Sequence, residues 1–161
     1  PRMRFDLVIN LFIAQAIQKG EITVFGGDQY RPFLHVHDAA DAIIFSLEKN
    51  LTGTYNVISE NLTIKQAAEK ISDITGCKIN FSNENEDKRN YKVSADKLKQ
   101  VGFQPSRTID NAIKEITDSI KNGKIKNYDD EKYSNYKLLF GSKEMQEKVF
   151  ILGIPGSLNI P

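Results

Sequence analysis

The segment from Asp6 to Lys19 constrains the fold most, because its residues are apolar almost all round over a helical length. A helix that is apolar on every side has to be covered by other elements. Asp6, near its start, suits the positive end of the helix dipole, and Gly20 is a natural end. We therefore expect a deeply buried helix, and a chain of 161 residues is long enough to build a core around it.

Short extended segments follow this helix. The β-branched and aromatic run 22–25 predicts a strand, and Gly26-Gly27-Asp28 predicts a turn. Residues 31–36 are expected to be extended, because Pro32 favours a strand start or edge. Asp38 is expected to cap a second helix over 39–49, rather than to act as a general base.

The remaining elements are marked by their caps. Residues 53–58 predict a buried strand, and Thr63 with Gln66 predicts a capping box that opens a helix ending at Gly76. A strand is expected at 78–81. Two more helices are expected, capped by Ser94 and by Thr108, and the second of them ends at Gly123.

These elements define an α/β chain of about five helices and several short strands. Strands and helices do not alternate from the start, which argues against a complete dinucleotide-binding fold. The sequence also lacks a Gly-x-x-Gly-x-x-Gly run. We expect a domain over residues 1–123 and a partly irregular tail over 124–161.

The charge composition argues against two classes of partner. Lys and Arg number 22 and Asp and Glu number 21, for a net charge of +1. Nucleic acids and membranes both require a concentrated basic surface. The apolar stretch 7–17 is too short to span a bilayer, which needs about 20 residues. The lone Cys77 rules out an internal disulfide and is expected to be packed, which fits a reducing compartment, and we expect a cytoplasmic protein.

An arginine lies on stiff backbone in the segment 24–38. Arg31 directly precedes Pro32, and a guanidinium held in this way can bind two phosphate oxygens through its forked donors. An exposed hairpin arginine would explain the same residues. His35 and His37 do not predict a metal site, because the chain has no third histidine and a single cysteine. The acidic run 84–87 predicts a solvated loop, or a loop that lines the mouth of a substrate site.

Several segments in order resemble a known family. The run from Gly27 to Asp38, Gly-Asp-x-x-Arg-Pro-Phe-Leu-His-Val-x-Asp, resembles the C-terminal nucleotide-sugar-binding part of extended short-chain dehydrogenases/reductases. These NAD-dependent epimerases and dehydratases include UDP-glucose 4-epimerase and dTDP-glucose 4,6-dehydratase. Further similar segments, within a resemblance over residues 1–136, are 2–10, 53–57, 87–97 and 102–105.

The resemblance implies a role for individual residues. It assigns substrate contacts to Asn10, Leu11, Thr23, Phe25, Arg31 and Arg89. Arg31 and Arg89 would bind the diphosphate, although many members carry Arg-Pro-Gly-Asp near the second arginine and this chain does not. Asn10 and the Leu11 backbone would contact the diphosphate and nucleotide. Thr23 and Phe25 would hold the base through their backbone, although Phe25 and Phe33 could equally be core residues.

The resemblance also implies what lies outside this chain. NAD would be bound by a preceding N-terminal half, which the chain lacks, and we expect no catalytic, cofactor-binding or metal residue here. The pair Tyr133 and Lys137 matches the family's Tyr-x-x-x-Lys spacing by coincidence, because it lies in the expected tail.

We therefore expect the C-terminal fragment of an NAD-dependent nucleotide-sugar epimerase or dehydratase, which is a homodimer when complete. One alternative is a non-catalytic module that binds a nucleotide sugar or another protein. Another is a fragment that pairs with a separately encoded half through an exposed apolar face that includes Leu7, Leu11 or residues 149–152.

Overall fold

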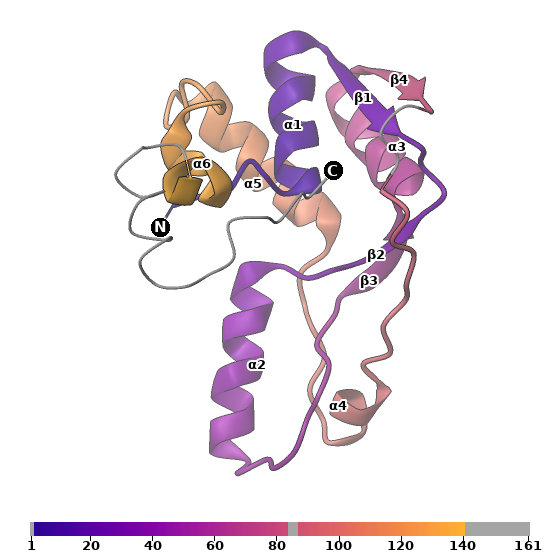
Figure 1. Cartoon of the computed structure of the whole chain (residues 1–161). Coiled ribbons are helices and arrows are strands. Elements are labelled where there is room, and N and C mark those ends of the chain that lie inside the picture. Colours follow the sequence, from indigo (N-terminus) through magenta and orange to yellow (C-terminus); the bar gives the residue numbers. More distant parts are fainter. Residues whose placement is uncertain (1, 84–86, 141–161) are drawn as a thin grey trace.

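The computed structural model describes residues 2–83 and 87–140, and Figure 1 shows their arrangement. Helices α1, α3 and α5 pack together in the main body, while α2 and α4 lie apart from it (Figure 1). The helices and strands, in chain order, are α1 (Val8–Lys19), β1 (Glu21–Phe25), β2 (Tyr30–Phe33), α2 (Val36–Glu48), β3 (Glu60–Thr63), α3 (Ile64–Thr75), β4 (Lys78–Ser82), α4 (Asp96–Gln100), α5 (Ile109–Lys121), the 3-10 helix η1 (Glu131–Tyr133) and α6 (Asn135–Phe140).

The described strands form two small sheets. β1 pairs in parallel with β4, and β2 pairs antiparallel with β3. In the second sheet Arg31 lies opposite Leu62, so β3 holds the strand that carries the arginine. The strands expected at 22–25 and 78–81 are confirmed, as is the α/β class.

The core forms where α1 meets β1, α3 and α5. Fully buried aliphatic side chains come from each of these elements: Ile13, Ile22, Ile71 and Ile113. Burying one such side chain stabilises a fold by about 1.5–3 kcal/mol. The deep burial expected of the first helix is confirmed.

Local sequence explains where the helices of the main body begin and end. The capping box of Thr63 and Gln66 is confirmed, and α3 ends at Gly76 in the left-handed conformation with φ 74°. Thr108 caps α5 as expected, and Asn111 completes a second capping box there. A side-chain cap of this kind contributes about 1 kcal/mol.

Helix α2 differs from its expectation at its start, and much of its apolar surface is exposed. It begins at Val36, and its N-cap is His35 rather than Asp38. The strand ends at Phe33 and His35 still has extended backbone with φ −72° and ψ 140°, so the extended segment ends one residue earlier than expected. Of the apolar side chains on this helix, Ala42 is buried against Leu98 and Phe103, but others point to solvent. The exposed fractions are 73% for Val36, 63% for Ile43, 54% for Ile44 and 73% for Leu47.

The strand expected at 53–58 is wrong for this structure. These residues form no ladder with any strand in the described ranges, and none of them is buried. A strand needs a neighbour to take up its backbone hydrogen bonds, and no described segment lies in that place. The chain here is held instead by side chains, since the Lys97 ammonium donates to the Thr54 carbonyl at 2.8 Å.

The chain after Gly123 returns to the main body. Ile125 and Tyr128 are buried with α1 in the core, and Tyr133 packs edge-on against Phe5 with ring centres 5.3 Å apart. The segment 149–152 lies outside the described residues. Within the part of the chain that the structure describes, no helix has the length and apolar character that a bilayer span requires.

Candidate functional site

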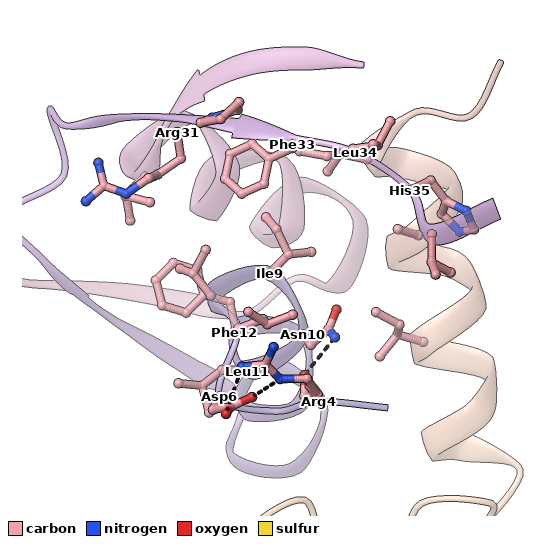
Figure 2. A pocket seen from close by; sticks show the side chains of 18 of the residues that line it. Arg4, Asp6, Ile9, Asn10, Leu11, Phe12, Arg31, Phe33, Leu34 and His35 are labelled. Atoms are coloured by element: carbon pink, nitrogen blue, oxygen red, sulfur yellow. Dashed lines mark hydrogen bonds and ion pairs between the residues drawn. The ribbon is translucent and has the colours of Figure 1, made fainter. Parts of the chain in front are cut away.

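A cavity of about 1050 Å³ lies between α1 and β2. Figure 2 shows Ile9, Asn10 and Phe12 of α1 on one side, with Arg31 and Phe33 of β2 on the other. The ends of β1, α2 and α5 complete its lining. All six residues expected to contact substrate line this one cavity: Asn10, Leu11, Thr23, Phe25, Arg31 and Arg89.

The strand β1 presents two of them by simple alternation. Ile22 and Val24 are fully buried on the core side, so Thr23 and Phe25 point to the cavity side. Phe25 is 42% exposed, so the core-packing interpretation is wrong for this residue. Phe33 does pack against the main core while it lines the cavity.

Arg31 is held firmly in the cavity wall. Its side chain is 13% exposed, which rules out the exposed hairpin arginine. One terminal nitrogen, Nη1, donates to the Tyr30 carbonyl at 2.8 Å and also to the Arg89 carbonyl. The other, Nη2, forms an ion pair with Oδ2 of Asp87 at 2.8 Å. The guanidinium lies 5.5 Å from the centre of the Tyr91 ring.

Arg89 reaches the same carboxylate from the solvent side. Its Nη2 lies 2.7 Å from Oδ2 of Asp87, and its side chain is 77% exposed. The hydrogen bonds from Arg89, and after them that from Arg31, hold the pKa of Asp87 well below its usual range. The two arginines therefore share one counter-ion at the cavity wall. Asp87 lines the cavity, in line with the interpretation of the acidic run as a loop at the mouth of a substrate site.

The α1 side of the cavity carries a second charged pair. Arg4 binds Asp6 with Nε to Oδ1 at 2.9 Å, which lowers the pKa of Asp6. Asn10 donates from Nδ2 to the Arg4 carbonyl at 2.7 Å, so its side chain fixes the entry into α1. The amide of Asn135 donates to Asp6 at 3.0 Å and joins α6 to this corner.

The other end of the cavity is formed by the start of α2 and by α5. His35 Nε2 lies 3.2 Å from Oε2 of Glu115, and its Nδ1 accepts from the His37 amide at 3.2 Å. His35 thus holds the start of α2 against α5. In residues 2–83 and 87–140, no group of three or more His, Cys, Asp and Glu side chains could hold a metal ion.

Asp38 has a different role from the one expected. It is 1% exposed and binds the segment before α5 through Ser106 and Arg107. Burial raises the pKa of Asp38, but the hydrogen bonds from Arg107 and Ser106 outweigh it and lower the pKa overall. This carboxylate is a clamp between α2 and the start of α5.

Sequence reasoning missed several partners in this site. Each of these partners pairs with a residue more than 50 positions away in the sequence. They are Asp87, which binds Arg31, Glu115, which binds His35, and Arg107, which binds Asp38. The sequence signals for Asp87 were its place in the acidic run 84–87 and its position two residues before Arg89.

The glycine turn does not fit a dinucleotide. Gly26 and Gly27 lie between β1 and β2, so no helix N-terminus follows to receive a phosphate. Gly27 has φ 130°, and a Cβ atom there would meet Cβ of Lys65 at 3.4 Å. This glycine is explained by the close approach of the turn to α3.

Comparisons with known proteins agree with this geometry. Residues 4–57 match the model of the NAD dependent epimerase/dehydratase family. Over these residues the chain is similar to that family. It is 34% identical over 113 residues to UDP-glucuronic acid decarboxylase 3 of Arabidopsis thaliana, covering 65% of this chain and 33% of that protein. The chain spans about a third of the length of the curated relatives it matches.

Solved structures share the fold over most of the chain. UDP-N-acetylglucosamine 4-epimerase from Bacillus cereus is 26% identical with a TM-score of 0.59, over 73% of this chain and 40% of that one. The dTDP-glucose 4,6-dehydratase from Bacillus anthracis, determined in complex with NAD, has a TM-score of 0.62 at 24% identity. It covers 74% of this chain and 40% of that chain. These comparisons support the expected resemblance to NAD-dependent epimerases and dehydratases.

Proposed function

We propose that this chain is the substrate-binding part of an NAD-dependent enzyme that epimerises, dehydrates or decarboxylates a nucleotide sugar. The observation that carries the proposal is the convergence of six expected contact residues, two of them arginines, on one cavity. The family match over residues 4–57 supports the same class of reaction.

The role of Arg31 follows from its surroundings. A diphosphate is costly to hold in a partly dry cleft unless its charge is paired. Arg31 is nearly buried and fixed by two backbone carbonyls, so little side-chain entropy remains to be lost when it binds an anion. Arg89 is exposed and supplies a second guanidinium at the same wall.

The rest of the cavity suits a nucleoside. Thr23 and Phe25 of β1 lie where their backbone and side chains border the cavity, and Ile9 and Phe12 give it an apolar floor. Fixing the diphosphate and the base in this way would position the sugar, so binding energy from the nucleotide serves the chemistry of the sugar.

Hydride transfer would be supplied by NAD on a separate nucleotide-binding part, since no described turn of this chain fits a dinucleotide. The exposed face of α2, formed by Val36, Ile43, Ile44 and Leu47, supports this arrangement. Large apolar side chains gathered on one helix face mark a contact surface. Residues 54–58 form no ladder in the described ranges, and Tyr55 and Val57 pack against the cluster around Ala42 of α2, so this segment suits the edge of a sheet in that part. Of the other apolar face expected, Leu7 is 46% exposed and Leu11 is half-buried, while residues 149–152 lie outside the described ranges.

Removal of the Arg31 guanidinium tests the proposal. We expect Arg31→Ala to weaken the binding of UDP to the full chain by about 1.5–3 kcal/mol, the scale of a lost hydrogen bond to a charged group. Titration calorimetry measures this change. Lys114→Ala is the matched control, because it removes the same charge from an exposed position of α5 outside the cavity lining. Equal UDP affinity for Arg31→Ala and Lys114→Ala would show that Arg31 is not a phosphate ligand.

A further inference from the structure

We propose that Asp87 is an internal counter-ion that occupies the anion position between Arg31 and Arg89 and is displaced when a ligand phosphate binds. This inference rests on the proposed function, in which Arg31 binds the diphosphate. It assigns to Asp87 a role as a specificity-determining residue, because an anion can enter only if it binds the two guanidinium groups better than the carboxylate does.

The contacts of the carboxylate place it between the two arginines. Its Oδ2 accepts from Nη2 of Arg31 at 2.8 Å, from Nη2 of Arg89 at 2.7 Å and from Nε of Arg89 at 3.1 Å. Its Oδ1 accepts from Nε of Arg89 at 2.9 Å. One oxygen atom thus accepts from both guanidinium groups, as a terminal oxygen of a phosphate group could.

Asp87 occupies the position that a phosphate oxygen bound to both arginines would take. Nη1 of Arg31 is already bound to the carbonyls of Tyr30 and Arg89, so it serves to orient the side chain. Nη2 contacts Asp87 through one of its two N–H groups. A phosphate oxygen that binds Arg31 and Arg89 together therefore competes directly with Oδ2 of the carboxylate.

Displacement is feasible because Asp87 is not buried. Its side chain is 41% exposed, so the released carboxylate can return to water. Ion pairs at this exposure are weak, and a diphosphate carries more charge and more acceptor oxygens than one carboxylate. Anions that offer no more charge than a carboxylate gain nothing by the exchange, so the site favours multiply charged ligands.

A local role for Asp87 makes the opposite prediction. Its Oδ1 also accepts from the backbone amide of Arg89 at 3.1 Å, and this bond shapes the loop. If Asp87 served mainly to hold the arginines for the ligand, its removal would weaken binding rather than strengthen it.

The test uses Asp87→Asn in the full chain, with UDP as the probe in titration calorimetry. Asparagine keeps the shape and one oxygen acceptor for the loop but removes the charge. We expect UDP to bind roughly 3–10-fold more tightly, the range that weak ion pairs represent. Asp118→Asn is the control, since it removes one negative charge from an exposed position of α5 outside the cavity lining, and it should change affinity by less than about twofold.

The outcomes separate this inference from the proposed function. Tighter binding by Asp87→Asn that disappears when Arg31→Ala is added supports the counter-ion. Unchanged or weaker binding by Asp87→Asn, with Arg31→Ala still weakening UDP, overturns the counter-ion alone. If Arg31→Ala has no effect, or if neither the unaltered chain nor Asp87→Asn binds UDP, the proposed function and this inference are both overturned.

Discussion

Removal of the buried carboxylate at Asp38 should weaken the fold strongly. Asp38 accepts from the amide of Arg107 at 2.9 Å, from the amide of Ser106 at 3.2 Å and from Nη1 of Arg107 at 2.7 Å. In Asp38→Ala the two amides lose their acceptor, and a buried donor left unpaired costs about 1–3 kcal/mol. Because water can reach part of this partly buried cluster, we expect a total loss of about 2–4 kcal/mol in the free energy of unfolding.

Urea unfolding followed by circular dichroism measures this loss. Asp41→Asn is the matched control, because Asp41 also pairs with Arg107, at 2.8 Å, but its side chain is 50% exposed. An exposed pair of this kind contributes little, so we expect a change within about 0.5 kcal/mol for the control. Equal losses in Asp38→Ala and Asp41→Asn would refute the clamp between α2 and the start of α5.

Two further predictions follow from the charges and from the exposed face of α2. The pKa values of Asp6, Asp38 and Asp87 are all lowered by folding, so these carboxylates stabilise the fold above their unfolded pKa of about 3.9, and this stability is lost as the pH falls below it. Thermal unfolding should therefore give a nearly constant midpoint temperature from about pH 7 to 5 and a falling one below about pH 4. In Asp38→Asn the fall at low pH should be smaller. An acid profile in that variant identical to that of the unaltered chain contradicts the assignment to Asp38. The double variant Ile43→Lys, Leu47→Lys should reduce self-association of the chain in light scattering while its unfolding midpoint stays the same, since both side chains are exposed. Unaltered scattering would contradict the contact surface.

Sequence patterns predicted the elements whose signals are local. The capping pair Thr63 and Gln66, the glycine that ends α3 and the β-branched and aromatic run of β1 all act within a few residues, and each appears as expected. The six candidate contact residues were placed in one cavity by the family resemblance, not by spacing, because α1, β1, β2 and the loop at Arg89 lie far apart in sequence.

The failures arose where distant segments decide the structure. Asp38 fits the pattern of a helix cap, but the cap is His35, and Arg107, 69 residues away, binds the carboxylate instead. Residues 53–58 have strand-like composition, but a strand exists only with a neighbour. The sequence of α2 does not tell which of its apolar residues are covered, and within the described chain Val36, Ile43, Ile44 and Leu47 are exposed. In each case the sequence identifies the residue type but not its partner.

The short junction between β2 and α2 joins the cavity wall to the helix that carries the exposed apolar face. Only Leu34 and His35 separate the strand that carries Arg31 from the first turn of α2. His35 and Asp38 then fasten that turn to α5 through Glu115 and Arg107. Strand and helix are therefore both fastened to α5 at this junction. A partner that binds the far end of α2 would be connected to the wall of the cavity through it.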